Sequence, residues 1–216
     1  GTPYIHLKAA ITLDGKVANA KNESKWITDE AARKVAHEFR RRHDATAIGR
    51  LTLQEDNPEL TVRHVDCERN KRRLVFADVS KIDGDLPSYQ LFQGLESAPT
   101  TVITHEKYIN SDNILTLKDL GVDLIFHSGD ALSQGVMREL VDRGVYSLLV
   151  EGGSGLLTSF VKASNYDELS LFMAPFMIGN GKSFFENSDI HPMQNLERMQ
   201  LDSLDAIGDQ ILASYI

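Results

Sequence analysis

A strand-like apolar run passes through three glycines into a helix-like segment at residues 150–157 (VEGGSGLL). Glycines let a backbone approach a phosphate closely, and the free N–H groups at the start of a helix attract its negative charge. The spacing is not the G-x-G-x-x-G of dinucleotide-binding Rossmann domains. The pattern therefore indicates either a phosphate site or a tight strand-to-helix turn without a ligand, and it does not choose between them.

A second polar segment covers residues 49–63 (GRLTLQEDNPELTVR) and follows directly after an apolar run. In open α/β sheets, ligands bind beyond the carboxyl ends of the strands, so a polar loop at this place is a candidate site. The alternative is a plain loop that ends at Asn57 and Pro58, with Asp56 capping a turn. Composition alone favours the plain loop.

A third candidate site lies near the start of the chain. Lys8 falls on the first predicted strand, and Ser24 and Trp26 precede the first predicted helix. An indole at that place can form the wall of a cleft for a heterocycle, although a lone tryptophan is more often a core anchor.

The sequence contains no motif that indicates a metal site or a hydrolase. The seven histidines include no H-E-x-x-H pair, and the single cysteine, Cys67, excludes a zinc site built on several cysteines. Ser154 stands in GGSG rather than in the G-x-S-x-G of a hydrolase nucleophile. We assign no metal and expect no hydrolase activity.

Composition limits the partners that the chain can attract. It has 23 Lys and Arg against 31 Asp and Glu, a net charge of −8, which gives no general field for nucleic acid or an anionic membrane. An anionic ligand must then be held by a local cluster of positive groups. No apolar run approaches the roughly 18 residues that span a bilayer, and a single cysteine fits a reducing compartment. We expect one cytoplasmic domain over residues 1–216, with no nucleic-acid or membrane partner.

Hydrophobic periodicity indicates the elements that position these residues. Residues 4–12 alternate with the period of a strand, and residues 29–42 follow helical spacing after Thr28, the predicted N-cap. Helical patterns also occur at 132–141 and 156–161. Short apolar runs typical of buried parallel strands occur at 45–48, 73–77, 100–104, 122–126 and 146–150. The alternation predicts a doubly wound α/β fold, with a mostly parallel central sheet flanked by helices.

The C-terminal part has a different character. Residues 169–174 are strand-like, and residues 198–201 and 210–215 form a pair joined through Gly208. We expect an antiparallel edge there.

Five segments with distinctive motifs occur along the chain. They are KAAITLDG (8–15), SKWIT (24–28), DATAIG (44–49), TLQEDNPELTVR (52–63) and VEGGSG (150–155). Together they resemble the reductase domain of the bacterial bifunctional riboflavin-biosynthesis deaminase-reductases, in the right order and over the whole chain. The resemblance implies a dihydrofolate-reductase-like fold and NADPH as the cofactor. It also implies reduction of the ribosyl group of 5-amino-6-(5-phosphoribosylamino)uracil to a ribityl group.

The resemblance implies a set of cofactor-binding residues. Arg50 departs from the small residue that the family usually has after Gly49, and it resembles the Gly-Arg of dihydrofolate reductases. We expect its guanidinium to pair with the 2′-phosphate and to favour NADPH over NADH. The full set is Ala10, Trp26, Gly49, Arg50, Thr52, Asp56, Gly152, Gly153, Ser154, Gly155, Leu156 and Ser159.

Substrate contacts are implied for Ser24, Arg40, Leu60, Arg63 and Glu151. Arginine suits bidentate recognition of a sugar phosphate, so we expect Arg40 and Arg63 to converge on the phosphate of the substrate.

The implied reaction passes a hydride from C4 of the nicotinamide to C1′ of the ribosylamine in its open imine form. Asp56 and Glu151 are expected to organise the proton that the nitrogen needs, and Lys8 to stabilise charge nearby. The alternatives are a turn cap for Asp56, a paired strand-end charge for Glu151 and a solvated strand residue for Lys8.

Other functions remain open at this stage. The chain could reduce the 2,5-diamino-6-ribosylamino-pyrimidinone 5′-phosphate instead, act as a dihydrofolate-reductase-like enzyme, or be a non-catalytic partner of a deaminase. The deaminase half is missing, so we expect deamination to come from another polypeptide or from a removed N-terminal part. The family and the apolar C-terminal strands predict a homodimer.

Overall fold

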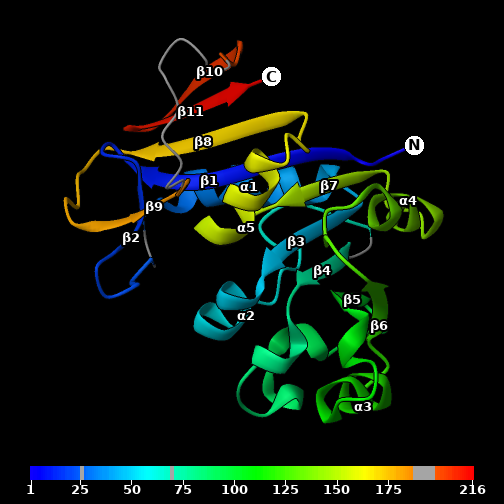
Figure 1. Ribbon diagram of the computed structural model, residues 1–216. Helices are drawn as coiled ribbons and strands as arrows, with labels where there is room; N and C mark the ends of the chain where they lie inside the picture. Colours follow the sequence, from blue (N-terminus) through cyan, green and yellow to red (C-terminus); the bar gives the residue numbers. More distant parts are fainter. Residues whose placement is uncertain (25–26, 69–70, 187–197) are drawn as a thin grey trace.

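The computed structural model describes residues 1–24, 27–68, 71–186 and 198–216. Its main sheet has nine strands in the order β10-β11-β8-β1-β7-β3-β4-β5-β6 (Figure 1). Neighbours from β8 to β6 are parallel, whereas β11 is antiparallel to both β8 and β10. The expected mostly parallel sheet with an antiparallel C-terminal edge is confirmed. The strands are β1 (Tyr4–Thr12), β3 (Ala45–Gly49), β4 (Arg72–Phe76), β5 (Thr100–His105), β6 (Asp123–His127), β7 (Ser147–Val150), β8 (Glu168–Ala174), β10 (Leu201–Ile207) and β11 (Gln210–Tyr215).

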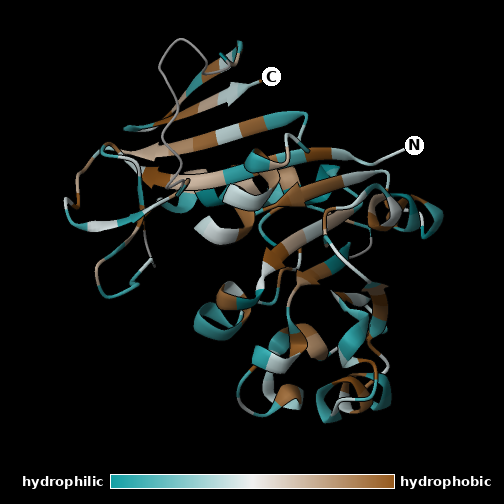
Figure 2. Cartoon of the chain, in the orientation of Figure 1, coloured by the Kyte–Doolittle hydropathy of each residue, from teal (hydrophilic) through white to brown (hydrophobic). Residues whose placement is uncertain are grey.

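Helices and short 3-10 turns connect these strands. Figure 2 shows apolar residues along the central strands of the main sheet and a mixture of apolar and hydrophilic residues on the helices, as expected for helices with one buried face. The helices are α1 (Glu30–Arg42), α2 (Arg50–Asp56), α3 (Asp112–Asp119), α4 (Gln134–Asp142) and α5 (Ser154–Lys162), and the 3-10 turns are η1 (Val79–Lys81), η2 (Leu86–Ser88), η3 (Gln90–Phe92) and η4 (Glu106–Tyr108).

A separate antiparallel ribbon is formed by β2 (Lys16–Asn19) and β9 (Gly181–Ser183). In Figure 1 this β2–β9 ribbon stands apart from the main sheet, beside the carboxyl ends of β1 and β8. The sequence patterns did not predict it.

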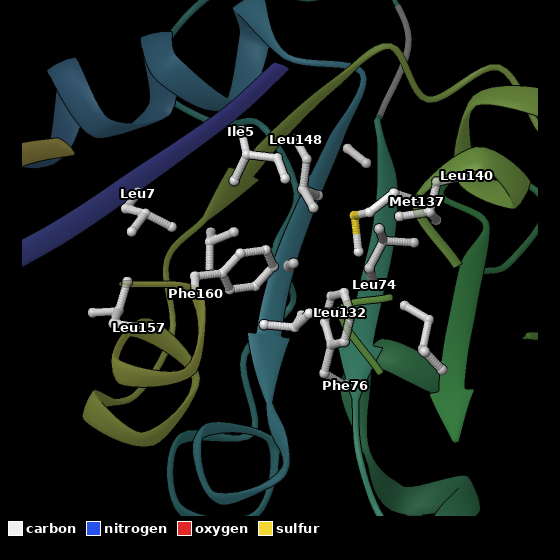
Figure 3. Packing of buried hydrophobic residues seen from close by; sticks show 14 of the residues in the cluster. Ile5, Leu7, Leu74, Phe76, Leu132, Met137, Leu140, Leu148, Leu157 and Phe160 are labelled. Atoms are coloured by element: carbon white, nitrogen blue, oxygen red, sulfur yellow. The ribbon is translucent and has the colours of Figure 1, made fainter. Parts of the chain in front are cut away.

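The core lies on both faces of the sheet. In β4, Leu74 and Phe76 join a cluster that includes Phe160 of α5 (Figure 3). Val75 points to the opposite face and joins a cluster that includes Ile114 of α3, because successive side chains of a strand alternate between faces. Burying each such side chain contributes roughly 1.5–3 kcal/mol. Burial on both faces also explains why this strand has a continuous apolar run instead of an alternating one.

Helix α1 begins one residue later than Thr28 predicted. The carboxylate of Asp29 accepts a hydrogen bond from the N–H of Ala32 at 2.9 Å, so Asp29 is the N-cap. The prediction of Thr28 was wrong because both residue types are good caps and only the geometry separates them.

The segment that was expected to be a polar loop begins as helix α2. It is a single short helix with only Leu53 buried, which leaves no periodic apolar pattern to detect. Asn57 ends it in the left-handed conformation (φ 41°), and Pro58 follows.

The C-terminal hairpin was predicted with the wrong bounds for its first strand. Strand β10 covers Leu201–Ile207 rather than residues 198–201. Most of its residues are exposed, so polar side chains interrupt the apolar pattern.

Among the described residues, no helix is long and apolar enough to cross a membrane.

Candidate active site

Two adjoining cavities open at the carboxyl ends of the parallel strands, where open α/β sheets bind ligands. The large cavity, of about 470 Å³, lies between α2, α5 and the ends of β4, β5 and β6. The small cavity, of about 170 Å³, lies between β1, the start of α5 and the segment that contains β2. Four residues line both cavities, and we call this shared part the neck: Thr52, Glu55, Gly153 and Lys182.

The glycine turn before α5 forms one side of the neck, and its glycines have different roles. Gly153 has a positive φ of 54°, and a Cβ there would meet Thr52 Oγ1 at 3.0 Å. A Cβ on Gly152 would lie 2.8 Å from Ile48 Cβ, so that glycine is required by close packing. A Cβ on Gly155 would meet nothing within 4 Å. Only Gly153 therefore combines a strained backbone conformation with a position facing both cavities.

The start of α5 offers unused hydrogen-bond donors. Its N-cap is Gly153, which provides no side-chain acceptor for the first amides of the helix. The hydroxyl of Ser154 is buried and has no hydrogen-bond partner among the described residues. Leaving such a group unpaired costs about 1–3 kcal/mol, so a ligand that pairs with it gains that much. These features fit a phosphate of a dinucleotide.

Two members of a largely buried ion cluster, Lys8 and Glu151, line the small cavity. Glu151 follows β7, and its side chain is 8% exposed. Arg40 of α1 holds it with two hydrogen bonds, Nε to Oε1 at 2.5 Å and Nη2 to Oε2 at 2.9 Å. Lys8 Nζ lies 4.0 Å from the same carboxylate and 5.3 Å from the ring centroid of Phe172. Two cations therefore surround one anion away from solvent.

The cluster fixes the protonation of its carboxylate. Burial raises the pKa of Glu151, but the charge and hydrogen bonds of Arg40 outweigh burial and hold that pKa at about 2. Burial lowers the pKa of Lys8, against the opposing effect of Glu151. At neutral pH Glu151 is ionised, so it accepts hydrogen bonds and does not donate a proton.

The loop after α2 is held against α1. His37 Nδ1 accepts the backbone N–H of Arg63 at 2.9 Å, and Arg40 Nη1 donates to the carbonyl of Thr61 at 3.1 Å. The Arg63 side chain is 51% exposed and pairs with Glu59 at 2.5 Å. Of the two arginines expected at the substrate phosphate, Arg40 thus bonds the segment that contains Arg63. Neither arginine lines the two cavities.

Leu60 lies in this loop with a positive φ of 53°, which is unusual for a branched side chain. Its side chain is buried in the core cluster that contains Val75. Packing therefore compensates for the backbone strain.

Most of the sequence-predicted site residues meet at the two cavities. Gly152 and Leu60 are buried beside them and line neither, and Trp26 lies outside the described residues. The large cavity is lined by Gly49, Arg50, Thr52, Gly153, Gly155, Leu156 and Ser159. The small cavity is lined by Lys8, Ala10, Ser24, Thr52, Asp56, Glu151, Gly153 and Ser154.

Two histidines at the far end of the large cavity were not predicted. His105 and His127 are register partners that end β5 and β6, and their ring centroids are 5.2 Å apart. Nδ1 of His127 is buried without a partner in the described part of the chain. Their positions at the ends of adjacent predicted strands could have identified them. No cluster of described residues could hold a metal ion.

Comparisons with known proteins establish the family. Residues 3–213 match the RibD C-terminal domain. The chain belongs to this family. RibD of Aquifex aeolicus (strain VF5), a riboflavin biosynthesis protein, is 38% identical over 213 residues, which are 99% of this chain and 57% of that protein.

Two further relatives of the RibD C-terminal domain family bear on function. A second A. aeolicus protein, a 2,5-diamino-6-ribosylamino-4(3H)-pyrimidinone 5′-phosphate reductase, is 28% identical over 221 residues, covering 99% of this chain and 96% of its own length. The crystal structure of a diaminohydroxyphosphoribosylaminopyrimidine deaminase/5-amino-6-(5-phosphoribosylamino)uracil reductase from Thermotoga maritima has a TM-score of 0.79. It is 26% identical and matches 99% of this chain and 56% of its own length.

The relatives indicate the class of reaction, and they show how much of the RibD protein this chain matches. Members of the family are reductases of riboflavin biosynthesis, which implies a nicotinamide cofactor. The chain spans 57% of the A. aeolicus RibD protein. The recognised family and the fold expected from it are confirmed.

Proposed function

We propose that this chain reduces the ribosyl group of 5-amino-6-(5-phosphoribosylamino)uracil to a ribityl group, with NADPH as the reductant. The observation that carries the proposal is the small cavity, in which Lys8 and Glu151 meet beside the phosphate-suited start of α5. A single ligand could pass through the neck and occupy both cavities, because Gly153 lines both.

The cofactor orientation follows from this arrangement. Its pyrophosphate would bind at the start of α5, its adenosine in the large cavity and its nicotinamide on the side of the small cavity. When bound, it supplies a hydride to C1′ of the substrate. Arg50 lines the large cavity, where its guanidinium donates to the side chain of Gln54 and to the carbonyl of Lys81. We therefore assign Arg50 to the 2′-phosphate.

The small cavity would orient the substrate. Ionised Glu151 would accept hydrogen bonds from hydroxyl or N–H groups of the substrate, and this positioning is the main catalytic contribution that we assign to it. Lys8 carries protons next to the same site and has a lowered pKa, so it is the better proton source. Asp56 lines the cavity from the end of α2 and would act through water.

The substrate phosphate would bind on the α1 side of the small cavity. Arg40 bonds the carbonyl of Thr61, and His37 of the same helix accepts the backbone N–H of Arg63, so both arginines lie on the α1 side, which supports their convergence on one anion. Arg40 is paired with Glu151 and Arg63 with Glu59, so the phosphate would compete with the exposed Glu59 carboxylate for the guanidinium of Arg63.

The test is oxidation of NADPH with three substrates, namely the enzymatically prepared deaminated pyrimidine phosphate, its 2,5-diamino precursor and dihydrofolate. We expect the deaminated compound to give the highest kcat/KM, with NADPH preferred over NADH. Equal kcat/KM for the two cofactors would reject the assignment of Arg50. No oxidation with any of the three substrates would support a non-catalytic partner of a deaminase.

The 2,5-diamino compound is the second candidate substrate. Its support is that this chain matches 96% of the length of the A. aeolicus 2,5-diamino-6-ribosylamino-4(3H)-pyrimidinone 5′-phosphate reductase. Against it, the identity to A. aeolicus RibD is higher. A higher kcat/KM for the diamino compound would decide for this alternative.

We also propose a homodimer in the cytoplasm, with deamination performed by another polypeptide or another part of a longer chain. Strand β10 exposes Leu201 and Leu204 at the open edge of the sheet, where a second copy can pair. Sedimentation would test this assembly, and a monomer at micromolar concentration would reject it.

A further inference from the structure

Lys182 lies beside the proposed cofactor site, and none of the roles proposed above belongs to it. It lies on β9 of the β2–β9 ribbon and lines both cavities at the neck. Other described residues of the ribbon, such as Val17 and Ala18, line only the small cavity. Lys182 is therefore the residue through which the ribbon reaches the large cavity.

The backbone around Lys182 holds it in place. A Cβ on Gly181 would lie 2.4 Å from the carbonyl oxygen of Ala18, so only glycine lets β9 pair this closely with β2. The carboxylate of Asp14, just after β1, accepts the backbone N–H groups of Ile178 at 3.2 Å and Gly179 at 2.7 Å. These bonds tie the segment before β9 to the main sheet.

The charge of Lys182 is available to a ligand. Among the described residues, no hydrogen bond or ion pair engages its ammonium group. Glu55 shares the neck, and its carboxylate would repel a bound phosphate. In a chain of net charge −8, a cation at this point supplies the local positive charge that an anion requires.

The neck determines which part of the cofactor lies beside Lys182. A dinucleotide that extends from the large cavity to the small one places its central pyrophosphate at the neck. The start of α5 would donate N–H groups to it there, beside Gly153. Lys182 comes from a different element and lines the same neck.

We propose that Lys182 binds the pyrophosphate of the nicotinamide cofactor at the neck, together with the start of α5. The inference rests on the proposed cofactor orientation. Lys182 and Arg50 then have different roles. Lys182 contacts a group that NADPH and NADH share, whereas Arg50 is assigned to the 2′-phosphate that only NADPH has.

The experiment measures the Kd of NADPH and of NADH for the wild type, Lys182→Gln, Lys182→Arg and Arg50→Gln. Lys21→Gln is the matched control, because Lys21 is an exposed residue just after β2 that lines neither cavity. Loss of one charge-assisted contact should raise the Kd of both cofactors about tenfold in Lys182→Gln. Lys182→Arg should retain most of the affinity, and Lys21→Gln all of it. Arg50→Gln should weaken NADPH alone.

The outcomes separate the inference from the function on which it rests. If the wild type binds neither cofactor, the proposed function fails. If the wild type binds NADPH and Lys182→Gln binds it equally well, the assignment of Lys182 is overturned. An effect of Lys182→Gln on NADPH alone would move the residue to the 2′-phosphate, and an effect only on substrate KM would move it to the substrate.

Discussion

The small and large cavities adjoin at one neck but differ in their polar groups. At the small cavity, Lys8 and Glu151 belong to a largely buried ion cluster, and Arg40, which does not line the cavity, already bonds Glu151 before any ligand arrives. The unpaired groups lie elsewhere: among the described residues, His127 Nδ1 in the large cavity and Ser154 Oγ at the start of α5, beside the neck, lack a partner. A preformed ion cluster suits the orientation of a reacting group, whereas unpaired groups suit binding of a ligand that supplies the missing partners. The comparison predicts that mutations in the small cavity affect folding as well as activity, and that those lining the large cavity mainly affect affinity.

The largest expected effect is on stability at the ion cluster. Glu151→Gln removes the one anion between Arg40 and Lys8 and leaves two buried cations, which should lower the free energy of unfolding by about 3–5 kcal/mol. Arg50→Gln, on the rim of the large cavity, should change it by no more than about 0.5 kcal/mol. Urea denaturation followed by circular dichroism measures both. Similar unfolding free energies for the two variants would remove the distinction between the cavities.

The same cluster should make stability depend on acid. The pKa of Glu151 is lowered to about 2 in the folded chain from an ordinary 4.5, so its stabilising effect is complete above about pH 5 and is lost as pH falls towards 2. The difference between these two pKa values corresponds to about 3 kcal/mol of stability, as an order of magnitude. Unfolding free energies of wild type and Glu151→Gln, measured from pH 7 to pH 3, should therefore converge at low pH. Parallel curves would contradict an ionised, paired Glu151.

Gly153→Val should act on binding at the neck. The branched side chain would meet Thr52 Oγ1, block the approach of a phosphate to α5 and occupy a positive φ. We expect the Kd of NADPH to rise at least about tenfold, with a loss of stability of roughly 1–3 kcal/mol that leaves the domain folded at 25 °C. Fluorescence titration gives the affinity, and Gly144→Val is the control, because Gly144 also has a positive φ (82°) but lines neither cavity, and a Cβ there meets nothing within 4 Å. An unchanged Kd would reject the phosphate site at this turn.

The effect expected at Arg63, outside both cavities, is confined to the substrate. Arg63→Lys keeps the charge but loses the planar fork, so the KM of the substrate should rise by an amount equivalent to about 1–3 kcal/mol. The Kd of NADPH should stay unchanged, and steady-state kinetics with a cofactor titration would test both. If NADPH affinity falls and substrate KM does not move, the cofactor occupies that side of the site.

The sheet could be predicted because its signals are local. Tyr4–Thr12 and the short buried runs have the apolar patterns of strands, and the glycine turn before α5 is visible as three glycines after a strand. The rule that ligands bind at the carboxyl ends of parallel strands then led us to expect the site residues at that edge, where most of them line the two cavities.

The parts that could not be predicted depend on contacts between distant residues. Arg40 and Glu151 are 111 positions apart, so no spacing in the sequence shows that they neutralise each other. Strand β9 is only three residues long and has no apolar pattern, which hides Lys182. His105 and His127 each follow a predicted strand directly and could have been noticed, but that they face one another depends on the alignment of β5 and β6 in register.

Gly152 has a consequence for how this protein tolerates mutation. A Cβ there would lie 2.8 Å from Ile48 Cβ and 2.9 Å from Ile48 Cα, a backbone atom that cannot move aside alone. In a saturation-mutagenesis screen for growth without riboflavin, every substitution of Gly152 should therefore score as damaging, even though the residue lines neither cavity. The exposed Gly155, only three positions away, should accept alanine. Such a screen would thus find the packing contact between β3 and the glycine turn as intolerant of substitution as the residues that line the cavities.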